Sequence, residues 1–337
     1  RENIMCAKRL SILCPVAIAA LALLALVAVR PGAAADPQYK FRIGTVTTKQ
    51  NPVGQGAVRL AEVAEQQSKG RVKVDVFDAG QLGGELDMVS QIRLGSLDMA
   101  IIGSGIVASV EPTFSITELP FIWKSDDSAR KVLDGPTGRK ILGLLEVKGI
   151  KALAWGEWGF RGILTTKKPI EAPEDLKGLK IRVIENPLYV TTLRAFGANA
   201  VPMAWPEVYT GLEQGTIDGV DTNYAGMFDA KLYEVTKNLA VTDHIYTAVV
   251  VLMNRKKFQS LPKDLQDVML QAGKAGGERT RETARKANND SIQFMASKGL
   301  KVTRPDRKPF EDRVPDVYKR FIAQVGQDLI DEVKAAQ

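Results

Sequence analysis

Two arginines in the middle of this 337-residue chain have the side-chain type and the setting needed to bind an anion. Arg182 lies inside the apolar segment 180–184, and Arg161 follows two aromatic residues, Trp158 and Phe160. A guanidinium group is a rigid planar donor that forms two parallel hydrogen bonds with a carboxylate. An arginine within an apolar strand either extends its charged end to water or is directed at such an anion, and the sequence leaves both interpretations open.

Trp205 is a second candidate for a binding pocket. It precedes Pro206 and follows a strand-like segment, so its indole could form a flat apolar wall beside a ligand. The same pattern also fits an ordinary core residue, and the sequence does not separate these two roles.

The sequence gives little support for a hydrolase or a transition-metal enzyme. His244 is the only histidine, and its place between two apolar runs is typical of a structural turn residue. No G-x-S-x-G motif is present, although residues 103–105 read Gly-Ser-Gly after an apolar run. Cys6 and Cys14 are the only cysteines, so thiolate and imidazole metal ligands are scarce. A site built only from carboxylates stays open.

Nucleotide cofactors are not indicated either. Segments 54–56 and 103–105 each have the pattern G-x-G, but neither continues to the third glycine of a dinucleotide-binding turn. The chain also has no G-x-x-x-x-G-K-[ST] phosphate loop. We therefore predict a protein without a cofactor.

The first 35 residues differ from the rest and are predicted to be a secretory signal peptide. A basic start at Lys8 and Arg9 precedes an apolar run over 10–29, and Ala33 to Ala35 offer a small-residue cleavage site. A retained membrane anchor is the alternative, because about twenty apolar residues span a bilayer. Four of the 46 basic and one of the 39 acidic residues lie in this segment, so cleavage lowers the formal charge from +7 to +4. So small a charge does not indicate a nucleic-acid partner.

Beyond residue 38, short apolar strands alternate with amphipathic helices. Segments 41–46, 72–77 and 97–102 have strand patterns and are separated by helices over 53–67 and 86–94. Strands that alternate with helices pair in parallel through crossover connections. The sequence therefore predicts an α/β protein, and its length suggests about two domains of about 150 residues.

The second half follows the same plan. We expect strands at 149–155, 162–166, 180–184 and 246–253, helices at 187–196 and 206–214, and closing elements over 300–303 and 310–333. Helical character also extends over 262–298, interrupted only by Gly273 and by Gly276 with Gly277. A helix of this length could brace two domains at once.

Short motifs in a fixed order then point to a family. They are GQLGGE (80–85), LGSLDMA (94–100), ELPF (118–121), GFR (159–161), PIEAPEDLKGLKIRV (169–183), PMAWPEVY (202–209), GTIDGVD (215–221), YEV (233–235) and LPKDLQ (261–266). With these motifs the chain resembles the periplasmic substrate-binding proteins of tripartite ATP-independent periplasmic (TRAP) transporters, of the dicarboxylate-binding DctP type. The resemblance covers nearly all of the chain beyond the predicted signal.

The resemblance implies a two-domain α/β fold of the periplasmic-binding-protein kind, type II-like, with a hinged cleft and a long helix that spans both domains. Segments 36–159 and 248–286 would form domain I, and segments 160–247 and 287–337 would form domain II. The implied function is capture of a small-molecule carboxylate in the periplasm and its delivery to the small and large membrane subunits of a TRAP transporter.

The resemblance also implies roles for single residues. Arg182 would form the salt bridge with the ligand carboxylate and Arg161 would assist, while either Thr222 or Asn223 would supply a polar contact. The full set of candidate ligand-binding residues is Arg182, Arg161, Trp205, Asn223, Thr222, Trp158, Ser104 and Tyr224.

Departures from the family pattern bear on the ligand. Segment 103–107, which follows the third strand, lacks the extra charged side chains of branches that bind polyhydroxylated sugar acids, so a sugar acid is less expected. The aromatic residues near the cleft favour a monocarboxylate with an apolar or aromatic body. A 2-oxo acid or a small dicarboxylate stays open.

Two other functions are compatible with the sequence. One is an exported enzyme that anchors a carboxylic acid on Arg182 and uses Glu157 or Asp221 as acid or base. The other is a sensor protein that presents its ligand to a receptor.

Overall fold

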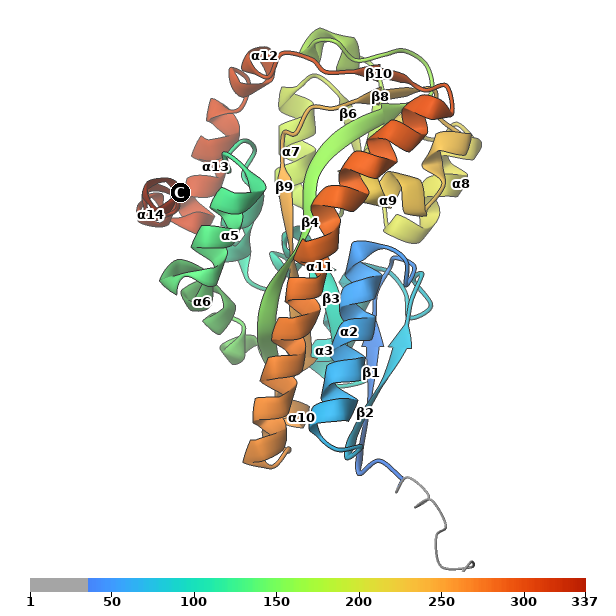
Figure 1. The fold of residues 1–337 in the computed structure, drawn as a ribbon. Helices are drawn as coiled ribbons and strands as arrows, with labels where there is room; N and C mark the ends of the chain where they lie inside the picture. Colours follow the sequence, from blue (N-terminus) through green and yellow to red (C-terminus); the bar gives the residue numbers. More distant parts are fainter. Residues whose placement is uncertain (1–35) are drawn as a thin grey trace, which may run out of the picture.

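The computed structural model describes residues 36–337, and the predicted signal peptide lies outside them. The described chain folds around a ten-stranded sheet (Figure 1). Eight strands have the order β2-β1-β3-β9-β4-β7-β5-β6, β8 also pairs with β4, and β10 pairs with β8. The strands are β1 (Tyr39–Gly44), β2 (Val72–Phe77), β3 (Met99–Gly103), β4 (Ile150–Thr165), β5 (Lys180–Val183), β6 (Asn199–Pro202), β7 (Gly219–Asn223), β8 (Asn238–Ala240), β9 (Tyr246–Asn254) and β10 (Lys301–Thr303). The predicted α/β class is confirmed.

Helices cover both parts of the sheet. The α-helices are α2 (Pro52–Gln67), α3 (Glu85–Leu94), α4 (Ser104–Val107), α5 (Asp126–Asp134), α6 (Pro136–Gly143), α7 (Pro187–Ala195), α8 (Val208–Glu213), α9 (Tyr224–Asp229), α10 (Arg255–Gln259), α11 (Lys263–Ser297), α12 (Lys308–Glu311), α13 (Pro315–Val325) and α14 (Gln327–Ala336). Short 3₁₀ helices are η1 (Pro112–Glu118), η2 (Glu146–Lys148), η3 (Pro173–Leu176), η4 (Trp205–Glu207) and η5 (Leu232–Glu234).

The first half has the predicted strand and helix order. Strand β1 pairs in parallel with β2 and β3, and helices α2 and α3 form the crossovers. The side chain of Asn51 caps α2 by accepting from the Val53 amide, and Pro52 occupies the first helical turn. The alternating apolar residues of the sequence therefore locate these strands correctly.

Strand β4 differs from the sequence prediction. Segments 149–155 and 162–166 were expected as two strands, but they belong to one strand of 16 residues. It pairs with β9 along its first part and with β7 and β8 at its end. The ladder with β9 shifts register between Glu157 and Gly159, and Gly159 has a φ of 96°. A glycine in this conformation accommodates a bulge, so the strand bends without ending.

Helix α11 confirms the predicted long helix and has 35 residues (Figure 1). The helix continues through its glycines, contrary to the expected interruption. These glycines instead allow neighbouring backbones to approach the helix closely. A Cβ on Gly276 would lie 2.8 Å from the carbonyl oxygen of Gly56 in α2, and one on Gly277 would lie 2.2 Å from that of Trp155 in β4. The helix is therefore fixed against both α2 and the central strand.

The C-terminal helices connect distant parts of the chain. Helix α13 contacts both η1 and α7, and the Tyr318 hydroxyl donates to the carbonyl of Pro120 at 2.9 Å. Figure 1 shows α13 and α14 beside α5. Among residues 36–337, no helix is both long enough and apolar enough to cross a bilayer.

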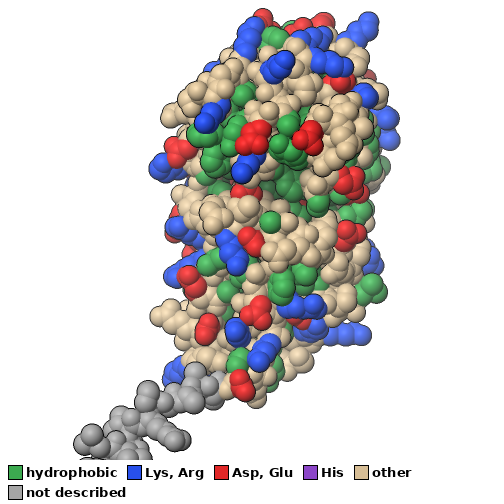
Figure 2. Space-filling model, turned by 90° about the vertical axis from the view of Figure 1, so that its right-hand side faces the viewer, with side chains coloured by type: hydrophobic (Ala, Val, Ile, Leu, Met, Phe, Trp, Pro, Cys, Tyr) green, Lys and Arg blue, Asp and Glu red, His purple; other side chains and the backbone are tan. Residues whose placement is uncertain are grey.

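Basic and acidic side chains are interspersed on the face that Figure 2 shows. That face has no continuous basic stripe of the kind that binds nucleic acid.

Candidate ligand-binding site

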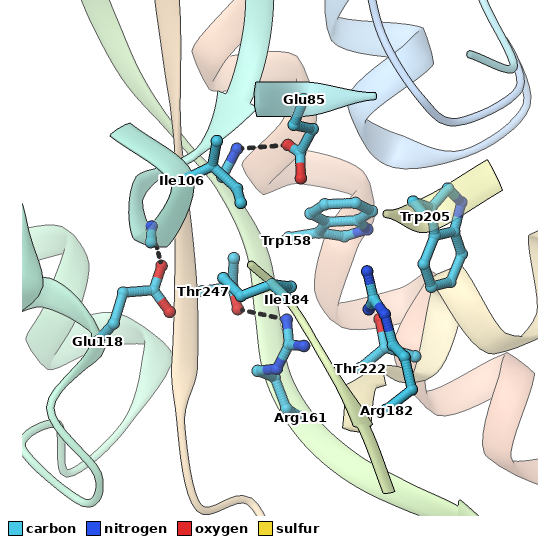
Figure 3. Close-up of a pocket in the computed structure, with 12 residues that line it drawn as sticks. Glu85, Ile106, Glu118, Trp158, Arg161, Arg182, Ile184, Trp205, Thr222 and Thr247 are labelled. Carbon is cyan, nitrogen blue, oxygen red and sulfur yellow. Dashed lines mark hydrogen bonds between the residues drawn. The ribbon is translucent and has the colours of Figure 1, made fainter. Parts of the chain in front are cut away.

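A small cavity lies where the two halves of the sheet meet (Figure 3). Its lining residues are Glu85, Gly103, Gly105, Ile106, Glu118, Trp158, Arg161, Arg182, Ile184, Trp205, Thr222 and Thr247. The cavity has a volume of about 20 Å³, which is room for little more than one water molecule. Four of these twelve residues have ionisable side chains, so the pairing of their charges decides which charged ligand the cavity can bind.

Arg161 is neutralised within the protein. Its Nη2 lies 2.9 Å from Oδ2 of Asp221, and its Nε donates to Oδ1 of the same carboxylate at 3.0 Å. Both side chains are buried. Burial raises the pKa of a carboxyl group, but the Arg161 and His244 side chains overcome this and hold the pKa of Asp221 at about 2. Arg161 therefore brings no net charge to the cavity.

His244 contacts the Asp221 carboxylate of this ion pair from outside the cavity. It is fully buried, its Nε2 lies 3.2 Å from Oδ1 of Asp221, and its Nδ1 lies 2.7 Å from the Thr242 hydroxyl. It does not line the cavity. His244 acts on the site through the orientation of Asp221, in line with the predicted structural role.

Arg182 has no such partner. Its Nε and Nη2 donate to the carbonyl oxygen of Met203 at 2.9 and 2.7 Å, and its guanidinium carbon lies 5.4 Å from the centre of the Trp205 ring. The residue is 3% exposed, and within residues 36–337 no carboxylate lies at salt-bridge distance from it. Burial and the charge of Arg161 lower the pKa of Arg182 to about 10.

Two carboxyl groups in the cavity were not predicted as site residues. Glu118 accepts hydrogen bonds from the Ser104 and Tyr189 hydroxyls and from the Gly105 amide at 3.0 Å, and burial raises its pKa to about 7. Glu85 accepts from the Gly103 amide at 2.7 Å, and burial raises its pKa as well.

Both glutamates lie in motifs that carried the family resemblance, but no pattern in the sequence indicates the orientation of their side chains. A usable signal for Glu85 is its position as the first residue of α3, directly after two glycines.

The structure brings five of the eight candidate residues together. Arg182, Arg161, Trp205, Thr222 and Trp158 line the cavity. Ser104, Asn223 and Tyr224 do not, and each of them has another partner.

The partners of these three residues explain their placement. The Ser104 hydroxyl donates to Glu118. The Asn223 side chain accepts from the Gly226 amide at 2.8 Å and caps α9, and the Tyr224 hydroxyl donates to Asp243 at 2.6 Å. Of the neighbouring residues Thr222 and Asn223, Thr222 lines the cavity, whereas the side-chain oxygen of Asn223 is used to cap α9.

The groups proposed for an enzyme are not assembled in this cavity. Glu157 is fully buried outside the lining, where Arg130 binds it at 2.6 Å and Tyr246 at 3.0 Å. Asp221 is occupied by Arg161. Neither carboxylate is among the residues that line the cavity.

The family comparison gives one match over most of the chain. The model of bacterial extracellular solute-binding proteins, family 7 (DctP), matches residues 43–324. A relative in Escherichia coli, the 2,3-diketo-L-gulonate-binding periplasmic protein YiaO, is 33% identical over 302 residues, which are 88% of this chain and 92% of the relative.

Solved structures have the same fold. The sugar acid binding protein DctPAm from Advenella mimigardefordensis, in complex with galactonate, superposes with a TM-score of 0.86 at 30% identity and covers 89% of this chain and 98% of that one. A TRAP periplasmic solute-binding protein from Sulfurospirillum deleyianum with bound succinate has a TM-score of 0.85 at 29% identity, with 89% and 100% covered. These matches confirm the predicted two-domain periplasmic-binding fold.

Proposed function

The chain belongs to family 7 of the bacterial extracellular solute-binding proteins, and we propose that it binds an organic acid through the carboxylate and presents it to a TRAP-type membrane permease. Members of this family are binding proteins rather than enzymes.

The unpaired guanidinium of Arg182 carries this proposal. A buried charge without a counter-ion is unfavourable, and a bound anion removes that penalty. A ligand carboxylate that replaces Met203 as the acceptor would gain a charge-assisted contact of about 1.5–3 kcal/mol. The ion pair of Arg161 and Asp221 lies beside it and leaves Arg182 as the group that selects an acid.

The small cavity implies movement during binding. An organic acid does not fit into a volume of about 20 Å³, so the walls must separate before it enters. We assign segments 36–159 and 248–286 to one lobe and segments 160–247 and 287–337 to the other. Strands β4 and β9 and helix α11 then connect the lobes, which supports a hinge at these elements.

We extend the proposal to the location and partners of the protein. The matching family is described as extracellular solute-binding proteins, and the relative YiaO is described as a periplasmic protein. Residues 1–35 would direct export and be cleaved near Ala35, and the small and large membrane subunits of a TRAP transporter would receive the ligand.

A thermal-shift screen tests the binding function. Residues 36–337 are unfolded, refolded to remove carried-over ligand, and heated with several dozen organic acids. A bound acid raises the melting temperature by mass action, and the Arg182→Ala variant should lose the shift. If no acid changes the melting temperature, the proposed function is wrong. If Arg182→Ala keeps the full shift, the role of Arg182 is wrong.

A further inference from the structure

We propose that the ligand is a hydroxylated organic acid with one carboxylate, and that Glu85 binds its hydroxyl groups and rejects a second carboxylate. This inference rests on the function proposed above and names its substrate class. It differs from the sequence expectation of an apolar or aromatic acid, which considered the loop after β3 but not the residues of α3.

The position of Glu85 provides the first argument. One carboxylate oxygen of Glu85 is held by the Gly103 amide at 2.7 Å, which fixes the side chain over the end of β3. The other oxygen has no hydrogen-bond partner in residues 36–337, and Figure 3 shows it directed into the cavity. A fixed carboxylate oxygen that faces a ligand accepts hydrogen bonds from hydroxyl groups.

The charges of the cavity provide the second argument. Among the described lining residues, Arg161 and Arg182 are the cations, and Asp221 already neutralises Arg161. Glu85 and Glu118 add two carboxyl groups on the opposite side, and of these Glu85 is the one with an oxygen that has no hydrogen-bond partner among residues 36–337. One ligand carboxylate can therefore be matched by Arg182, whereas a second would meet the Glu85 carboxyl group. Two carboxylates side by side require one of them to take up a proton, and a hydroxyl group requires no such step.

Unused polar groups provide the third argument. Trp158 is 5% exposed, and its indole Nε1 has no hydrogen-bond partner among the described residues. Thr222, which has a polar side chain, also lines the cavity. A buried donor that stays unpaired is unfavourable, so the ligand should present acceptors beyond its carboxylate. An apolar ligand body would leave the indole N–H unsatisfied, whereas a hydroxyl group accepts from it and donates to Glu85.

Two matched sets of acids test this proposal, since the structure does not fix the chain length. The four-carbon set is D-erythronate, meso-tartrate, butanoate and succinate. The six-carbon set is D-galactonate, galactarate, hexanoate and adipate. Each set varies the second carboxylate and the hydroxyl groups independently. Calorimetry on residues 36–337 measures the affinity for each acid at one pH and one salt concentration.

In at least one set, the hydroxylated monocarboxylate should bind roughly tenfold or more tightly than the three other acids. The Glu85→Gln variant keeps an acceptor for the Gly103 amide but removes the charge, so it should reduce the preference over the hydroxylated dicarboxylate to within roughly threefold. Glu213→Gln, on the exposed surface of α8, is the matched control and should keep the wild-type preference.

The possible failures are distinguishable. If a dicarboxylate or an acid without hydroxyl groups binds best, the inference is wrong while the proposed function stands. If Glu85→Gln keeps the full wild-type preference, the role of Glu85 is wrong. If none of the eight acids binds, and the broader screen also finds no acid, the proposed function fails together with the inference.

Discussion

Arg161 and Asp221 form a buried ion pair, with Nη2 2.9 Å from Oδ2, directly beside a second buried arginine that has no carboxylate partner. The two arginines therefore differ in role although both line the same cavity. We therefore propose that Arg161 mainly stabilises the fold and that Arg182 binds the external anion.

The two arginines should respond differently to the same substitution. Arg161→Met leaves the Asp221 carboxylate buried without its partner, so it should lower the free energy of unfolding by about 3–5 kcal/mol. Arg182→Met loses the hydrogen bonds to Met203 but also removes an unpaired charge, so it should change that free energy by about 1 kcal/mol or less. Urea denaturation of the ligand-free proteins measures both. Equal losses in the two variants would contradict the assignment of roles.

Glu118 should make stability depend on pH. Its pKa is raised from 4.5 to about 7 in the folded protein, so the folded state holds its proton more tightly than the unfolded state. The stabilising effect is complete below pH 4.5 and is lost as the pH rises to about 7. Glu118→Gln should therefore flatten the decline of unfolding free energy between pH 4.5 and 7.

Urea titrations at several pH values within this window compare the two proteins. The difference between them isolates the contribution of Glu118 from that of other titrating groups. Parallel curves for the wild type and Glu118→Gln would show that this carboxyl group is not perturbed.

The sequence predicted the fold better than it predicted the side-chain contacts in the cavity. Alternating apolar residues located the parallel strands of the first half, and the helical character over 262–298 located α11. The glycines of α11 were wrongly expected to interrupt the helix, because their effect depends on which backbone lies opposite, as at Gly277 and Trp155. Periodicity reports the direction of a side chain but not the neighbour it meets.

The same limit applies to the site. Arg182 was identified because a charge in an apolar strand is unusual, and Arg161 because it lies in a motif. The sequence contains no sign that Asp221, sixty residues away, would neutralise Arg161. Ser104 was named for its place after β3, but its hydroxyl donates a hydrogen bond to Glu118. Glu118 is the last residue of η1, which places it beside Ser104.

Gly277 should not tolerate a side chain. A Cβ at this position would lie 2.2 Å from the carbonyl oxygen of Trp155, so Gly277→Ala must push α11 away from β4. We expect a loss of about 2–3 kcal/mol of unfolding free energy, typical of overpacking. Gly143→Ala in α6 is the control, because its Cβ would meet no atom within 4 Å. Thermal denaturation that ranks the two variants equally would contradict the close approach of α11.

Trp205 should report binding. Its ring lies 5.4 Å from the guanidinium carbon of Arg182, so an acid that draws Arg182 away from Met203 changes the surroundings of the indole. Tryptophan emission of the wild type should change on addition of the acid with the largest thermal shift. Trp205→Phe should reduce this change, and Trp158, which lines the same cavity, should supply the part that remains. An unchanged response in this variant would contradict the displacement of Arg182 beside Trp205.

A crystal structure with the tightest-binding acid would show whether Arg182 receives the ligand carboxylate. The account predicts that both carboxylate oxygens accept from the Arg182 guanidinium at N–O distances of about 2.7–2.9 Å, with the ion pair of Arg161 and Asp221 intact. An acid bound with its carboxylate on another group, while Arg182 stays on Met203, would contradict it.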